Sequence, residues 1–141
     1  KQFRFSTSYE DEIAKASDVG WAIASLWGEL DAPSINRRLA WCVRTIAISR
    51  AAAMHMPAFS ADALAEALGY PNIVSLVGQK DRSDISDESL NGFLRFLAEY
   101  GYPRRDGDIN SIDQYVSYFT ETKNEVGLKL LKPTTFDSCY T

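Results

Sequence analysis

Residues 59–80 read FSADALAEALGYPNIVSLVGQK, a pattern that predicts a short helix, a tight turn and a second short helix. Ser60 is a suitable N-cap, because its hydroxyl can accept a hydrogen bond from a backbone N–H of the first turn. Gly69 can adopt the left-handed conformation that ends a helix, and Pro71 is tolerated where the next helix begins. The sequence therefore predicts two helices that meet at a turn containing glycine.

The sequence LAEALG at residues 64–69, followed by Val74 and Ser75, resembles the core of helix-turn-helix transcription regulators. In that family a small residue and a glycine four positions later let the two helices approach closely, and Ala65 and Gly69 have this spacing. The second helix departs from the family's pattern, since its apolar anchor Val74 comes about one residue early. The resemblance places a helix-turn-helix at residues 60–80.

This resemblance implies that the second helix, from Asn72 to Lys80, lies in the major groove of DNA and that the protein acts as a dimer. Asn72, Ser75 and Gln79 would contact bases or sugars, and Lys80 and Arg82 would contact phosphates. The alternative interpretation of the same residues is a helical hairpin whose alanine and leucine side chains belong to the core.

The composition predicts a single folded domain and gives only local support for binding nucleic acid. The chain has 141 residues, 45% of them hydrophobic, which is enough to form a core. Its net charge of −4 is unfavourable for phosphate binding, which needs clustered lysine and arginine. Residues 33–58 are an exception, because they contain four arginines and no acidic residue.

Cysteine and histidine usage argues against several other classes of protein. Cys42 and Cys139 are the only cysteines, so we expect neither a disulfide framework nor a metal cluster, and we expect a cytoplasmic setting. No segment approaches the roughly 20 apolar residues of a membrane span. His55 is the only histidine, and no catalytic motif accompanies it. We therefore expect no cofactor, no membrane association and no enzymatic activity.

The two longest helices are predicted before the 59–80 stretch. Residues 1–7 predict an extended arm, and Ser8 with Asp11 forms a capping box for a helix over residues 9–30. Apolar residues recur along this helix at three- and four-residue spacings, which places them on one face. They are Ile13, Ala16, Val19, Ile23, Leu26, Trp27 and Leu30.

A second long helix is predicted from about residue 34 to residue 56, and it has apolar residues on two faces. One face contains Ile35, Leu39, Cys42, Ile46 and Ala53, and the opposite face contains Arg37, Trp41, Arg44 and Ile48. Such a helix is either buried on both sides or contacts a partner, and a tryptophan flanked by arginines is typical of interface anchors. We expect a homodimer formed through the first two helices.

Residues 111–131 allow two interpretations after a helix predicted over 86–101. The first is a helix capped by Ser111 and Gln114, which we favour. The second is a hairpin with strands at 115–119 and 126–131, which would form the wing of a winged-helix fold and make the chain resemble the MarR-like regulators. The predicted fold is an all-α domain of about six helices over residues 1–132, with a C-terminal tail at 133–141.

Two functions follow from these patterns, and each has its own candidate residues. The first is a DNA-binding transcription regulator that uses residues 72–82. The alternative is a helical protein-interaction module of phage, effector or adaptor type, which uses Trp41 and the neighbouring arginines and has no catalytic activity.

Overall fold

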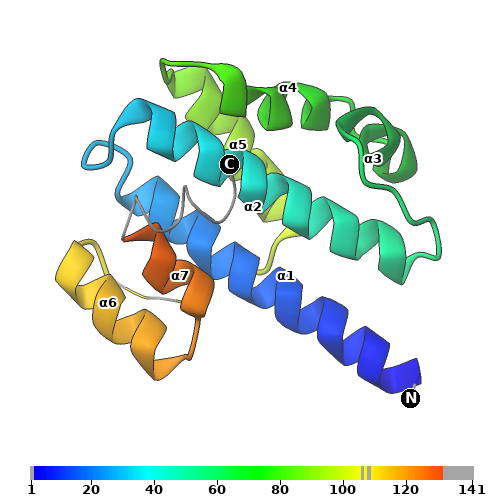
Figure 1. Cartoon of the computed structure of the whole chain (residues 1–141), viewed down its shortest axis with the longest axis horizontal. Helices are drawn as coiled ribbons and strands as arrows, with labels where there is room; N and C mark the ends of the chain where they lie inside the picture. Colours follow the sequence, from blue (N-terminus) through cyan, green and yellow to red (C-terminus); the bar gives the residue numbers. More distant parts are fainter. Residues whose placement is uncertain (1, 106, 108, 132–141) are drawn as a thin grey trace.

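The computed structural model describes residues 2–105, 107 and 109–131, with side chains described from residue 9 onward. These residues form seven α-helices and one 3-10 helix, and they contain no strand (Figure 1). The elements are α1 Gln2–Ser25, α2 Ala32–Ala53, α3 Ala61–Leu68, α4 Asn72–Gly78, η1 Gln79–Asp81, α5 Asp87–Tyr100, α6 Ile112–Glu121 and α7 Glu125–Leu130. The predicted all-α fold is confirmed, with one helix more than expected. The expected tail at 133–141 lies outside the described residues.

The long helices α1 and α2 pack side by side and hold the other elements (Figure 1). α3 and α4 pack against α2, α5 contacts both long helices, and α7 packs on α1 with α6 beside it. Fully buried side chains from most of the helices meet between these layers, among them Ile23, Leu39, Phe93 and Phe119. α2 contacts α1, α3, α4, α5 and η1. Leu39 on one of its apolar faces is fully buried, while Trp41 and Ile48 on the other are partly buried against the core.

The first helix begins earlier and ends earlier than the sequence predicts. The expected extended arm is wrong from Gln2 onward, because the backbone there is already helical. No glycine or proline separates residues 2–8 from the rest of the helix, so nothing in the chain stops the helix from extending past Ser8. α1 ends at Ser25, and the N–H of Glu29 donates to the carbonyl of Leu26 at 2.9 Å in the turn that follows.

Residues 109–131 form two helices, so the hairpin interpretation is wrong. Ser111 caps α6 as expected, because its Oγ accepts from the N–H of Gln114 at 3.3 Å. The single long helix is also wrong, because Lys123 adopts a left-handed backbone with φ of 57° and breaks it. Asn124 then caps α7 by accepting from the N–H of Gly127 at 3.0 Å. The break turns α7 back so that it packs on α1.

Hydrogen bonds and an ion pair hold the connection between α5 and α6 against α1. Ser17 Oγ accepts from the N–H of Tyr102 at 2.9 Å, and Trp21 Nε1 donates to the carbonyl of the same residue at 2.9 Å. Arg105 Nη2 lies 2.9 Å from Asp18 Oδ2, and the Asp18 side chain is only 4% exposed. Tyr118 donates from its hydroxyl to the same carboxylate at 3.4 Å. This buried carboxylate is therefore held by a cation and a hydroxyl.

Candidate functional site: the groove between α4 and α5

The helices α3 and α4 form over the residues for which the sequence predicts them. Ser60 Oγ accepts from the N–H of Ala63 at 3.2 Å and caps α3. Gly69 ends that helix with a left-handed backbone, φ 64° and ψ 35°. The N–H of Tyr70 donates back to the carbonyl of Ala65 at 2.9 Å, so the turn is closed before α4 begins.

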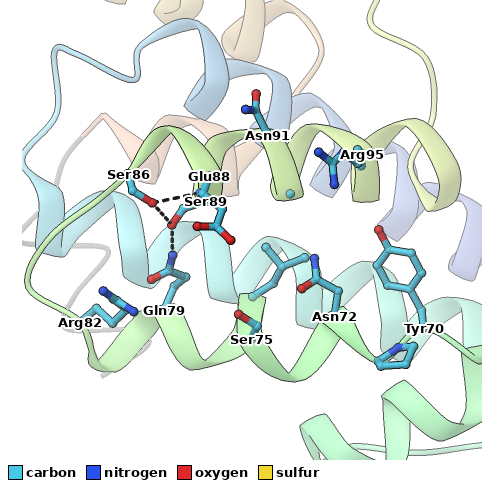
Figure 2. Close-up of a pocket in the computed structure, with 13 residues that line it drawn as sticks. Tyr70, Asn72, Ser75, Gln79, Arg82, Ser86, Glu88, Ser89, Asn91 and Arg95 are labelled. Carbon is cyan, nitrogen blue, oxygen red and sulfur yellow. Dashed lines mark hydrogen bonds between the residues drawn. The ribbon is translucent and has the colours of Figure 1, made fainter.

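The short helix α4 has its apolar side buried and its polar side turned toward α5. Ile73, Leu76 and Val77 are buried, and α4 packs on α2 with these residues. A groove of about 830 Å³ lies between α4 and α5, with walls from both helices and from the residues that flank them (Figure 2). Its lining residues are Tyr70, Pro71, Asn72, Ser75, Leu76, Gln79, Arg82, Ser86, Glu88, Ser89, Asn91, Gly92 and Arg95.

Four of the five residues predicted to contact DNA line this groove. Asn72 and Ser75 form its α4 wall and are exposed, while Gln79 is only 6% exposed. Arg82 lines one end and lies 3.3 Å from Asp84 through its Nε. Lys80 is exposed and does not line the groove. The structure thus brings four of these side chains together in a concave site shared with α5.

Gln79 is the most buried polar residue of the groove. Its Nε2 donates to the hydroxyl of Ser89, across the space between η1 and α5 (Figure 2). Ser89 Oγ also lies 3.0 Å from Ser86 Oγ, which caps α5. The second atom of the amide, Gln79 Oε1, is buried and has no hydrogen-bond partner among the described residues. Leaving a buried acceptor unsatisfied costs about 1–3 kcal/mol. The protein covers this atom, so a ligand in the groove would reach it only after the Gln79 side chain moves.

A second buried amide fixes the segment that joins α4 to α5. Asn36 of α2 is fully buried, and its Nδ2 donates to the carbonyls of Arg82 at 3.0 Å and Asp84 at 2.8 Å. These two bonds hold the segment between η1 and α5 against α2. The end of the groove that contains Gln79 and Arg82 is therefore attached to the central helix of the fold.

Tyr70 lines the other end of the groove. Tyr70 lies edge-on to Tyr100, with ring centroids 5.2 Å apart, and 6.1 Å from Phe96. Between the two ends, a Cβ added to Gly92 would lie 3.4 Å from Asn72 Nδ2 and 3.6 Å from Leu76 Cδ2. A Cβ at Gly92 would thus make ordinary van der Waals contacts with α4 below the groove.

Sequence reasoning missed the α5 wall of the site. It predicted a helix over residues 86–101 and did not consider the polar residues on the surface of this helix. Glu88, Gly92 and Arg95 follow one another at spacings of four and three residues, which places them on one side of a helix. That polar stripe around a glycine, next to the capped start of α5, is the signal from which the wall could have been found.

The residues predicted as a partner interface lie on α2, away from the groove lining. Arg37, Trp41 and Ile48 are partly buried, and Arg44 is exposed. Trp41 and Ile48 pack against the core cluster, and Arg44 Nε donates to the carbonyl of Phe59 at 3.1 Å. As expected, Trp41 is not freely exposed.

No group of three or more His, Cys, Asp or Glu side chains suited to a metal ion occurs in the described part of the chain. Among the described helices, none combines the length and the apolar character that crossing a membrane requires. Comparison of the chain with protein-family models, with curated proteins and with solved structures found no match.

Proposed function

We propose that the chain is a helical protein-interaction module that binds a segment of a partner protein in the groove between α4 and α5. The observation that carries this proposal is the groove itself, which has exposed polar side chains from two helices along its walls. They include Asn72 and Ser75 of α4 and Glu88 and Arg95 of α5. A peptide segment offers hydrogen-bond donors and acceptors to such side chains. The groove volume of about 830 Å³ falls within the range of ordinary ligand sites.

The DNA-binding regulator is the weaker proposal on the same residues. A recognition helix must project far enough to enter the major groove. The side of α4 that would contact bases instead lines the groove opposite α5, and Gln79 is bonded to Ser89. Around Lys80 and Arg82 the sequence places Asp81, Asp84, Asp87 and Glu88, which repel phosphate. The helix-turn-helix resemblance stays a prediction.

The homodimer and the cytoplasmic setting also stay predictions. The sequence argument for a dimer rested on the two apolar faces of α2 and on Trp21, which lies off the main apolar stripe of α1. Within the chain Trp41 and Ile48 are partly buried and Arg44 is exposed, so this face is compatible with a monomer and with a dimer. Light scattering at high micromolar concentration tests the dimer directly, and the interaction module is compatible with either result.

The test of the proposed function uses the amide NMR spectrum of the protein and a pool of random peptides, acetylated and amidated at their ends. The pool should shift amide signals of residues 70–95. Ser75→Trp fills the groove from α4 and should weaken these shifts at least about tenfold, because a bulky ring occupies the binding volume. Val74→Trp is the matched control, since Val74 is 42% exposed and does not line the groove.

Two results would remove the proposal. One is a spectrum that the pool does not change at millimolar concentration. The other is a set of shifts that Ser75→Trp and Val74→Trp affect equally. Retardation of random DNA fragments at low salt, measured beside the peptide experiment, tests the regulator. If Lys80→Ala with Arg82→Ala abolishes such retardation, DNA binding through residues 72–82 becomes the better function.

A further inference from the structure

Two charged side chains of opposite sign line the groove from the same helix. Glu88 and Arg95 are both exposed, and neither has a hydrogen bond or an ion pair with another described residue. Seven positions separate them on α5, so they lie on the same side of the helix and about 10 Å apart along its axis. The groove therefore has one acidic position and one basic position.

Arg82 is the third charged residue that lines the groove, and it does not offset this arrangement of one acidic and one basic position. Arg82 is paired with Asp84, at 3.3 Å from Nε to Oδ1 and 3.5 Å from Nη2 to Oδ2. Its charge is thus already matched by a carboxylate outside the lining. What remains is the Glu88 carboxylate at the start of α5 and the Arg95 guanidinium two turns further on (Figure 2).

The Glu88 carboxylate marks the acidic end, beside Ser89, to which Gln79 donates a hydrogen bond. This exposed carboxylate accepts hydrogen bonds, and a lysine or arginine side chain has only donors. At the other end the Arg95 guanidinium can hold a carboxylate by two parallel hydrogen bonds. Asn72 and Ser75 stand between the two ends on α4 and can bond a peptide backbone.

We propose that the groove binds an extended peptide segment that carries a basic and an acidic side chain about 10 Å apart. The basic side chain lies at Glu88, and the acidic side chain lies at Arg95. In an extended polyproline II segment, side chains three positions apart lie on the same face and about 9 Å apart, which matches the separation on α5. This inference rests on the proposed function and specifies the ligand of that site.

The opposite signs at the two ends also distinguish this ligand from a uniformly charged one. A nucleic acid or a purely acidic peptide would place negative charge beside Glu88, next to Asp87. A purely basic peptide would place positive charge beside Arg95. Each mismatch costs electrostatic energy in addition to the lost pair, so the site selects a segment with one basic and one acidic side chain.

The experiment measures the affinity of the protein for four short peptides of alanine and proline, which are acetylated and amidated at their ends. The peptides differ in one pair of residues three positions apart. The pairs are lysine with aspartate, lysine with lysine, aspartate with aspartate, and glutamine with asparagine. The wild-type protein should bind the lysine–aspartate peptide about three- to fivefold more tightly than each of the others, since exposed ion pairs contribute effects of this size. High salt should remove this preference.

Two charge reversals in the protein give the sharper result. Arg95→Glu makes both ends acidic and should transfer the preference to the lysine–lysine peptide. Glu88→Lys makes both ends basic and should transfer it to the aspartate–aspartate peptide. Both residues are exposed, so the fold should survive. Circular dichroism checks the fold of both variants. If a charge reversal does not fold, Arg95→Gln or Glu88→Gln takes its place, and each of these should remove the preference for one charge of the peptide.

The outcomes separate this inference from the function on which it rests. Equal binding of all four peptides overturns the charge selection, and so does a preference that neither reversal changes. If the random pool shifts residues 70–95 while none of the four peptides does, the ligand class is wrong and the groove is still a peptide site. If the random pool itself fails to bind, the proposed function is lost together with the inference.

Discussion

The ring of Phe119 occupies the space in which a side chain at Gly127 would have to stand. A Cβ added to Gly127 would lie 2.6 Å from both Cγ and Cδ2 of that ring, and Phe119 is fully buried. This contact is where α6 and α7 pack on each other, so the small residue permits the close approach of the two helices.

Gly127→Ala should therefore destabilise the protein. Alanine gains up to about 1 kcal/mol over glycine in a helix, but the added methyl overlaps a ring that is buried and cannot move freely. Overpacking of this kind costs about 1–3 kcal/mol. Denaturant unfolding measures the change, and we expect a net loss of stability of about 1 kcal/mol or more.

Gly92→Ala is the matched substitution and should have the opposite effect. Its added Cβ would stand 3.4 Å from Asn72 Nδ2, an ordinary contact, so the helix propensity decides the sign. We expect a stability equal to that of the wild type or greater by up to about 1 kcal/mol. If this variant lost as much stability as Gly127→Ala, the packing distances assigned to the two glycines would be wrong.

Leu26→Ala tests the main core. Leu26 is fully buried just after the end of α1, and it belongs to the cluster that α1 and α2 share. Removing its side chain should leave a cavity and cost about 2–5 kcal/mol of unfolding free energy. A loss below about 1 kcal/mol in urea unfolding would contradict this placement of the core.

The pair formed by Asp18 and Arg105 should respond asymmetrically to substitution. The Arg105 side chain is 56% exposed, so water can hydrate it when Asp18→Asn removes its partner. The Asp18 carboxylate is 4% exposed, so Arg105→Gln leaves a buried charge without its cation. We expect Arg105→Gln to cost about 1–3 kcal/mol and Asp18→Asn to cost less. Thermal unfolding of both variants under one set of conditions shows which is larger, and the reverse order would argue against this assignment.

Because of Cys42, the free energy of unfolding should fall as the pH rises in the alkaline range. Burial raises the pKa of its thiol above the ordinary value of 9.0. The unfolded chain then releases the thiol proton near pH 9, while the folded chain keeps it. The contribution of the buried neutral thiol to the free energy of unfolding is therefore complete below this pH and is lost as the pH rises above it. The loss approaches about 1.4 kcal/mol for each pH unit.

This prediction is measured by urea unfolding at several pH values between 8 and about 10.5. Cys139→Ser is the reference protein, since it leaves Cys42 as the single cysteine. Cys42→Ala in the same background should show a weaker fall of stability with pH, because ionisation of the remaining groups is common to both. Parallel curves for the two proteins would show that Cys42 ionises equally in the folded and unfolded states.

Sequence reasoning found the elements whose signals are local. Ser60 and Ser111 cap the helices that they were expected to cap, and Ser86 caps the helix predicted over 86–101. The left-handed turn at Gly69 ends α3 as predicted. Periodicity also identified the buried face of α1. These signals depend on neighbouring residues along the chain, so a single sequence is sufficient to recognise them.

The features that escaped prediction depend on residues far apart in the sequence. Lys123 breaks a helical pattern with a positive φ that non-glycine residues seldom adopt, and packing of α7 on α1 accompanies the break. The groove combines residues of α4 with Glu88 and Arg95 of α5, and no spacing within α4 indicates which wall lies opposite. The DNA-contact prediction used the polar residues at 72–82, and only the tertiary arrangement shows that four of them line a groove with α5.

The contact between Asn124 and α1 has a consequence for how the chain is made. Asn124 Nδ2 donates to the carbonyl of Lys15 at 3.1 Å, and 109 positions separate the two residues. During synthesis α1 leaves the ribosome before α7, and the part of its surface that α7 covers stays open until the intervening residues have emerged. A nascent chain stopped before α7 would therefore present this uncovered surface of α1 to chaperones and proteases.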